Sequence, residues 1–258
     1  MTQEEMNLLV PEKLNEIERT RSVKILHACE SGSRAWGFFS PDSYFDVRFI
    51  YKRSLNEYLS LNEIRDVIEM PIDDTWDVSG WDLSKTLRLL FKSNPTLYEW
   101  LSSPVCYLRT EFTDRIKPLL EEYFSSERMI YHYLNIAGNN MKQYMNADTV
   151  RPKKYFYMLR PVLACLWVLE EKTAPPVLFS ELEDSVMPRE LKGCVDELMN
   201  IKINTPEKSE IERLPEIDRF LNETSEMIRE RMNQLPKEEM KSWDDLNQFF
   251  VSEIRRGA

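Results

Sequence analysis

Hydrophobic and polar positions follow one pattern in the first part of the chain and a different pattern after about residue 110. Early in the chain, short apolar runs and alternating segments are typical of β-strands. Val23–Cys29 predicts a buried strand, and Phe45–Tyr51 predicts an alternating strand. Asp77–Asp82 is a third strand candidate that leads into a predicted helix at Leu83–Phe91. We therefore expect a sheet with helices in this part of the chain.

After residue 110 the pattern is almost wholly helical. The clearest helix is predicted at Tyr155–Glu170. Its apolar residues recur at helical spacing: Met158, Leu159, Val162, Leu163, Leu166 and Leu169. Pro161 is expected to kink or interrupt this helix, because proline has no amide hydrogen to donate. The pattern predicts an α+β protein with a mixed α/β domain at 1–110 and a helical domain at 111–258.

The composition supports a folded protein and limits its partners. With 42% hydrophobic residues, the 258-residue chain has enough apolar side chains to build a core. Its formal net charge is −10, whereas proteins that bind nucleic acid without sequence preference are usually basic. A polynucleotide partner must therefore meet a local basic patch, or the substrate is a small nucleotide.

The cysteine and histidine positions argue against a structural zinc site. Four cysteines are far apart in the sequence: Cys29, Cys106, Cys165 and Cys194. We interpret them as reduced residues of a cytoplasmic protein, and each histidine, including His27, as structural. No uninterrupted stretch approaches the roughly 20 apolar residues of a membrane-spanning helix, so no membrane partner is expected.

Polar residues at the ends of the predicted strands suggest phosphate chemistry. Gly32 and Ser33 close the first strand and open a helix, where backbone N–H groups favour an anion. Asp46 lies on the second strand and Asp82 ends the third. If these strands are neighbours, the two carboxylates are expected to face each other across one metal ion. Magnesium prefers such oxygen ligands.

The segment Gly32–Phe49 resembles the predicted nucleotidyltransferases of the DNA polymerase beta superfamily that are associated with bacterial RNA repair. Further similar segments are Ser79–Leu83, Asn94–Pro95, Glu99–Leu101, Ser103–Pro104, Lys153–Tyr155 and Leu159–Pro161. The resemblance implies a polymerase-beta-type nucleotidyltransferase domain, with a small mixed sheet and helices, followed by a helical domain. It implies an enzyme that transfers a nucleoside monophosphate from a nucleoside triphosphate to a hydroxyl acceptor, such as an RNA end, with Mg²⁺ or Mn²⁺.

The superfamily pattern is Gly-Ser, a short gap, Asp-x-Asp on a strand, and a third Asp on a later strand. This match makes Asp46 and Asp82 the catalytic, metal-binding residues, with Asp82 the better candidate for activating the acceptor hydroxyl. The first Asp position is Tyr44, and a phenol with a pKa near 10 is a poor magnesium ligand. Asp42 or Glu30 can supply the missing oxygen, or one metal ion suffices.

The substitution at Tyr44 leaves two other functions open. The protein can instead be a catalytically degenerate module that binds a nucleotide or another protein. A weaker option is a nucleotidyltransferase that modifies protein hydroxyl groups.

Several basic residues are candidates for binding nucleotide. Arg34 follows the Gly-Ser turn and can contact phosphate, although a surface ion pair is an equally good explanation. A later cluster contains Lys153, Lys154 and Arg160, interleaved with tyrosines. This cluster suits a triphosphate or an RNA end, with a solvated helix face as the alternative.

Overall fold

The computed structural model describes residues 2–40, 42–72, 75–206, 208–239 and 241–256. The chain divides into two compact units. The first contains Met1–Ala35, Tyr44–Tyr123 and Met240–Ala258, and the second contains Trp36–Ser43 and Phe124–Glu239. The main division thus follows Tyr123 rather than residue 110, and the end of the chain belongs to the first unit.

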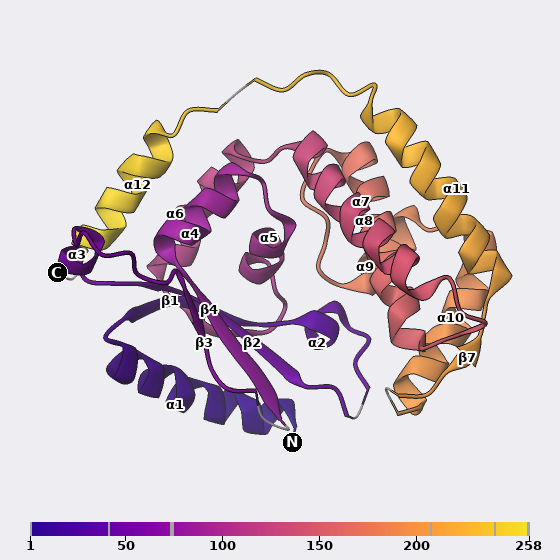
Figure 1. The fold of residues 1–258 in the computed structure, drawn as a ribbon, viewed down its shortest axis with the longest axis horizontal. Helices are drawn as coiled ribbons and strands as arrows, with labels where there is room; N and C mark the ends of the chain where they lie inside the picture. The colour runs from indigo at the N-terminus through magenta and orange to yellow at the C-terminus, as the bar shows by residue number, and fades with distance from the viewer. Residues whose placement is uncertain (1, 41, 73–74, 207, 240, 257–258) are drawn as a thin grey trace. The chain divides into compact units, whose positions relative to one another are not determined.

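The first unit is built on a five-stranded mixed sheet with the order β3-β4-β2-β1-β5. Its strands are β1 (Lys24–Ser31), β2 (Phe45–Lys52), β3 (Val67–Glu69), β4 (Trp76–Asp82) and β5 (Cys106–Arg109). Its helices are α1 (Gln3–Arg21), α2 (Gly32–Trp36), α3 (Leu55–Tyr58), α4 (Leu83–Phe91), α5 (Pro95–Leu101), α6 (Glu111–Glu122) and α12 (Asp244–Arg255). Helix α1 covers one face of the sheet, and α4, α5 and α6 lie on the other (Figure 1). Strands β2 and β4 are parallel, while the other neighbouring strands are antiparallel.

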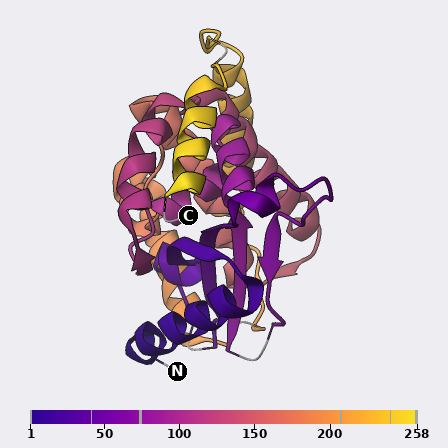
Figure 2. The same cartoon turned by 90° about the vertical axis from the view of Figure 1, so that its left-hand side faces the viewer.

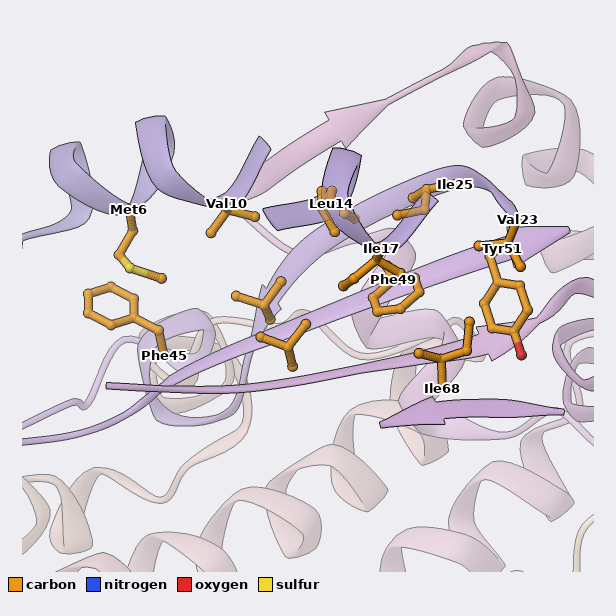
Figure 3. Packing of buried hydrophobic residues seen from close by; sticks show 13 residues of the cluster. Met6, Val10, Leu14, Ile17, Val23, Ile25, Phe45, Phe49, Tyr51 and Ile68 are labelled. Atoms are coloured by element: carbon orange, nitrogen blue, oxygen red, sulfur yellow. The ribbon is translucent and has the colours of Figure 1, made fainter. Parts of the chain in front are cut away.

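Helix α1 is held on the sheet by a stripe of apolar side chains. Thr2 caps the start of the helix, with Glu5 completing a capping box. Met6, Val10, Leu14 and Ile17 are buried and face the sheet (Figure 3). Full burial of such a side chain contributes roughly 1.5–3 kcal/mol, so this stripe is a major source of stability.

Strand β2 separates this apolar core from a polar surface. Phe45, Val47, Phe49 and Tyr51 belong to the cluster beneath α1. Because side chains alternate along a strand, Asp46 and Arg48 project from the opposite face. The alternation predicted at Phe45–Tyr51 is therefore confirmed, and it directs the charged residues away from α1.

The second unit is helical, with one short two-stranded sheet. Its elements are α7 (Ser126–Tyr144), β6 (Thr149–Val150), α8 (Pro152–Glu171), α9 (Phe179–Val186), α10 (Arg189–Asn204), β7 (Ile211–Glu212) and α11 (Pro215–Met232). Helix α8 is buried along most of its length and continues through Pro161. The expected interruption at Pro161 does not occur, because packing on neighbouring helices can outweigh one lost backbone hydrogen bond.

Helix α12 packs on the first unit beside α4 (Figure 2). The Phe249 ring lies against Phe112, and Arg115 donates two hydrogen bonds to the buried Glu253 carboxylate at 2.8 and 2.6 Å. Lys52 also donates to the carbonyl oxygen of Glu253 at 2.7 Å. These contacts explain why a segment distant in sequence belongs to the sheet-containing unit. Within the described residues, no helix is long and apolar enough to cross a membrane.

Candidate active site

The first strand ends in a tight turn at Gly32 and Ser33. Gly32 has a φ of +61°, and a Cβ at this position would lie 2.2 Å from Asp46 Oδ2. Glycine is therefore required both by the backbone conformation and by the close approach of the carboxylate. Because α2 is only five residues long, its dipole is small, and anion binding here would depend on individual N–H groups.

Asp46 and Asp77 lie next to each other on parallel strands. The register of β2 and β4 places Asp46 opposite Asp77. Arg48 Nη2 donates to Asp46 Oδ1 at 2.9 Å and to Asp77 Oδ2 at 2.7 Å, and Nη1 donates to the Asp77 carbonyl oxygen at 2.8 Å. The guanidinium thus holds both carboxylates in place and offsets their mutual repulsion.

Asp82 lies at the other end of β4. It pairs with Tyr51, five positions beyond Asp77, which is roughly 17 Å along a strand. Asp82 is 2% exposed and caps α4, accepting hydrogen bonds from Ser84 N–H at 2.8 Å and from the Tyr58 hydroxyl at 3.0 Å. The expectation that Asp46 and Asp82 face each other is therefore corrected: the parallel register brings Asp77 to Asp46.

Tyr44 precedes β2 and is 46% exposed. Its carbonyl oxygen accepts a hydrogen bond from Arg34 Nε at 3.2 Å. The Arg34 guanidinium also lies over the Phe45 ring, 3.7 Å from its centroid. Burial lowers the pKa of Arg34, while the nearby charges of Glu30 and Asp46 act in the opposite direction. Arg34 is thus fixed close to the Asp46 carboxylate.

Glu30 is completely buried and supports Asp46 through the backbone. Its Oε1 accepts a hydrogen bond from Asp46 N–H at 2.6 Å, and its Oε2 accepts one from the Tyr107 hydroxyl. Burial raises the pKa of Glu30 to about 7, although both hydrogen bonds act to lower it.

The orientation of Glu30 argues against a role as the missing metal ligand. Glu30 pairs with Val47, so its side chain projects from the α1 face, whereas Asp46 projects from the opposite face. The other candidate, Asp42, lies in the segment Trp36–Ser43 of the second unit. The supporting role of Glu30 could have been found in the sequence, because a glutamate at the end of an apolar strand is an unusual residue in a position expected to be buried.

The basic residues predicted to bind nucleotide are divided between the two units. Arg34 belongs to the first unit, whereas Lys153, Lys154 and Arg160 lie on α8 in the second. Arg160 is only 3% exposed and donates to the Val177 carbonyl oxygen at 3.2 Å. Its environment is that of a packed core residue.

The predicted combination of lysines and tyrosines is present at the start of α8. Lys154 Nζ lies 4.5 Å from the centroid of the Tyr144 ring and 5.1 Å from that of Tyr157. Lys153 Nζ lies 5.6 Å from the Tyr157 centroid. Binding of nucleotide by these lysines remains a prediction.

His27 is a structural residue, as expected. One ring nitrogen lies 3.1 Å from the Thr113 hydroxyl and the other 3.0 Å from the Trp100 carbonyl oxygen. Burial lowers the pKa of His27, which favours the neutral ring. In the described part of the chain, no group of three or more His, Cys, Asp or Glu side chains is arranged to hold a metal ion.

A comparison with known protein families agrees with the resemblance seen in the sequence. The model of the RNA repair pathway DNA polymerase beta family matches residues 6–252. The uncharacterized protein YcgL of Bacillus subtilis (strain 168) is 41% identical over 251 residues, covering 96% of each chain. A nucleotidyltransferase-like protein from Exiguobacterium sibiricum 255-15 is 11% identical, with a TM-score of 0.33 over 89% of this chain and 75% of that one. The family match over nearly the whole chain shows that this protein belongs to the RNA repair pathway DNA polymerase beta family.

Proposed function

We propose that the protein transfers a nucleoside monophosphate from a nucleoside triphosphate to a hydroxyl group at an RNA end. The observation that carries this proposal is the convergence of the Asp46 and Asp77 carboxylates on Arg48, beside the Gly32 turn. Membership of an RNA repair family supports RNA as the acceptor.

The donor set fits a divalent metal ion, Mg²⁺ or Mn²⁺, in the proposed site. Proteins usually hold magnesium with one or two carboxylates, while phosphates and water complete the octahedron. Asp46 and Asp77 would hold the ion in this way. A bound metal neutralises charge on the phosphoryl oxygens during transfer.

The side chains around this pair have separate proposed tasks. Arg48 keeps the two carboxylates together before substrate binds. Arg34, fixed over Phe45, attracts the triphosphate by its charge. Asp77 replaces Asp82 as our candidate for accepting the proton of the attacking hydroxyl, because it lies beside Asp46.

Tyr44 favours one alternative, a catalytically degenerate module that binds a nucleotide or a protein. Its phenol occupies the position where the family pattern has the first carboxylate, and losing a shared metal ligand weakens charge stabilisation in the transition state. The alternative predicts nucleotide binding, or protein binding, without transfer.

Transfer of label from α-labelled ATP, CTP, GTP and UTP onto total RNA and onto protein, with Mg²⁺ or Mn²⁺ and with Tyr44→Asp run beside wild type, tests the proposal. Wild type should label RNA, and Asp77→Asn should reduce labelling by at least about 100-fold, as expected for loss of a metal ligand. Asp82→Asn is the matched control: the same change at the far end of the same strand should leave most activity per folded molecule.

Three other outcomes have clear meanings. Loss of labelling in Asp82→Asn but not in Asp77→Asn would refute our assignment of the third carboxylate. Labelling by Tyr44→Asp alone would support the degenerate module. Labelling of protein but not RNA would refute RNA as the acceptor.

A further inference from the structure

Cys29 and Cys106 face each other across two antiparallel strands, β1 and β5. The next two opposed residues, Glu30 and Val105, are joined by a backbone hydrogen bond, in which Glu30 N–H donates to the Val105 carbonyl oxygen at 2.9 Å. Bonded and non-bonded pairs alternate in an antiparallel ladder, so the cysteines form a non-hydrogen-bonded pair. In a regular ladder the Cα atoms of such a pair lie about 4.5 Å apart, within the range of roughly 4.4–6.8 Å that disulfides span. A register shift between Ala28 and Cys29 lies next to this pair and places Tyr107 as an extra residue of β5.

The two thiols differ in accessibility but share one face of the sheet. Directly opposed residues project to the same side, and Cys106 Sγ lies 3.5 Å from the carbonyl oxygen of Ala28, the neighbour of Cys29. Cys106 is exposed, whereas Cys29 is completely buried. A reagent in solution would therefore reach Cys106 first, and Cys29 would react from within the protein.

We propose that Cys29 and Cys106 form a reversible thiol–disulfide modification site for a low-molecular-weight disulfide. The Cys106 thiolate attacks one sulfur of the small disulfide, breaks its S–S bond and releases one small thiol. Cys29 then attacks Cys106 Sγ and breaks the mixed disulfide, and its proton leaves with the second small molecule, which is released as a thiol. The protein loses two hydrogen atoms and two electrons, and the small disulfide is reduced to two thiols.

This disulfide would connect the edge of the sheet to the strand that leads into the Gly32 turn. β5 is an edge strand and carries Tyr107, whose hydroxyl donates to Glu30. On the other side of β1, Cys29 pairs with Arg48 of β2. Oxidation would therefore fix the strands that support Asp46 and Arg48, and would also constrain the unfolded chain.

The chain provides its own matched controls. Cys165 is buried in α8 of the second unit, with its Sγ 3.6 Å from the Ile130 carbonyl oxygen. Cys194 is partly exposed on α10. Substitution of Cys194 should leave the reaction between Cys29 and Cys106 unchanged, while it removes a thiol with some access to solvent.

The test is oxidation of the full chain with oxidised glutathione, followed by acid quenching, alkylation, digestion and mass spectrometry. In wild type and Cys194→Ser we expect one peptide pair linked through Cys29 and Cys106, with a mass loss of two hydrogens that dithiothreitol reverses. Cys106→Ser should keep Cys29 as a free thiol. Oxidation should also slow thermolysin cleavage several-fold in wild type, but not in Cys106→Ser.

A stable glutathione adduct on Cys106 beside a free Cys29 thiol would overturn the proposal, because it would show that the two sulfurs do not meet. A disulfide-linked peptide pair that contains Cys194 would also overturn the proposal. Circular dichroism verifies that Cys106→Ser is folded, and Cys29→Ala provides a second variant that should retain the adduct on Cys106. These results are independent of nucleotidyl transfer.

Discussion

The buried carboxyl group of Glu30 should make the stability of the protein depend on pH. Its pKa is raised from 4.5 to about 7, chiefly because burial penalises the charged form. A difference of this size corresponds to about 3 kcal/mol, at roughly 1.4 kcal/mol for each tenfold change in proton affinity. This is a substantial fraction of the 5–15 kcal/mol that typically, to order of magnitude, stabilises a folded protein.

The direction of the effect follows from proton binding. Unfolded protein loses the Glu30 proton near pH 4.5, whereas folded protein retains it until about pH 7. Between these values the folded state binds more protons, so the free energy of unfolding falls as pH rises. The stabilising contribution is complete below pH 4.5 and is lost as pH rises through about 7.

Glu30→Gln removes this ionisation while keeping a side-chain oxygen that can accept the Asp46 N–H. Urea unfolding of both proteins, followed by circular dichroism with EDTA from pH 4.5 to 8, measures the effect. The free energy of unfolding of the variant minus that of wild type should increase by about 3 kcal/mol over this interval. Contributions from all other titrating groups largely cancel in this difference.

Tyr107→Phe provides an independent check on the same reasoning. It removes a hydroxyl that donates to the Glu30 carboxylate and lowers its pKa. The pKa of Glu30 should therefore rise further, and the loss of stability should move to higher pH. Parallel pH profiles for wild type and Glu30→Gln would refute the assignment of a raised pKa to Glu30.

Four further substitutions test the fold and the site. Gly32→Ala should reduce nucleotidyl transfer, measured by label transfer, by at least about tenfold, because its Cβ would meet Asp46 Oδ2. The control Gly138→Ala places a Cβ in open space on a helix, so it should retain activity and raise the free energy of unfolding in urea by about 0.5–1 kcal/mol. Ile17→Ala should lower the free energy of unfolding by about 2–5 kcal/mol in urea titrations, because it leaves a cavity beneath α1. Glu253→Gln should lower it by about 1–3 kcal/mol, as the buried carboxylate bonded to Arg115 is lost, and preserved stability would contradict this account of α12 docking.

Local patterns identified helices and strands more reliably than they identified how the chain divides into compact units. The alternation in Phe45–Tyr51 correctly indicated a strand, because apolar residues at every second position must share the buried face. The compact units divide after Tyr123 rather than at residue 110, because α6 packs on β1 and α12 belongs with the first unit. These are long-range contacts, which local periodicity does not report.

The sequence by itself determined the α+β class and the family resemblance, and it predicted the Gly32 turn and the Asp46 carboxylate of the candidate site, since each depends on residues close together in the chain. Only the tertiary structure showed that Asp77, and not Asp82, lies beside Asp46, because the two residues are near opposite ends of β4 and the register with β2 pairs Asp77 with Asp46. It likewise placed Cys106 opposite Cys29 and turned Glu30 to the face opposite Asp46. The physical reason is the two-residue period of strands: local sequence indicates which residues share a face, but only strand pairing determines which of them meet.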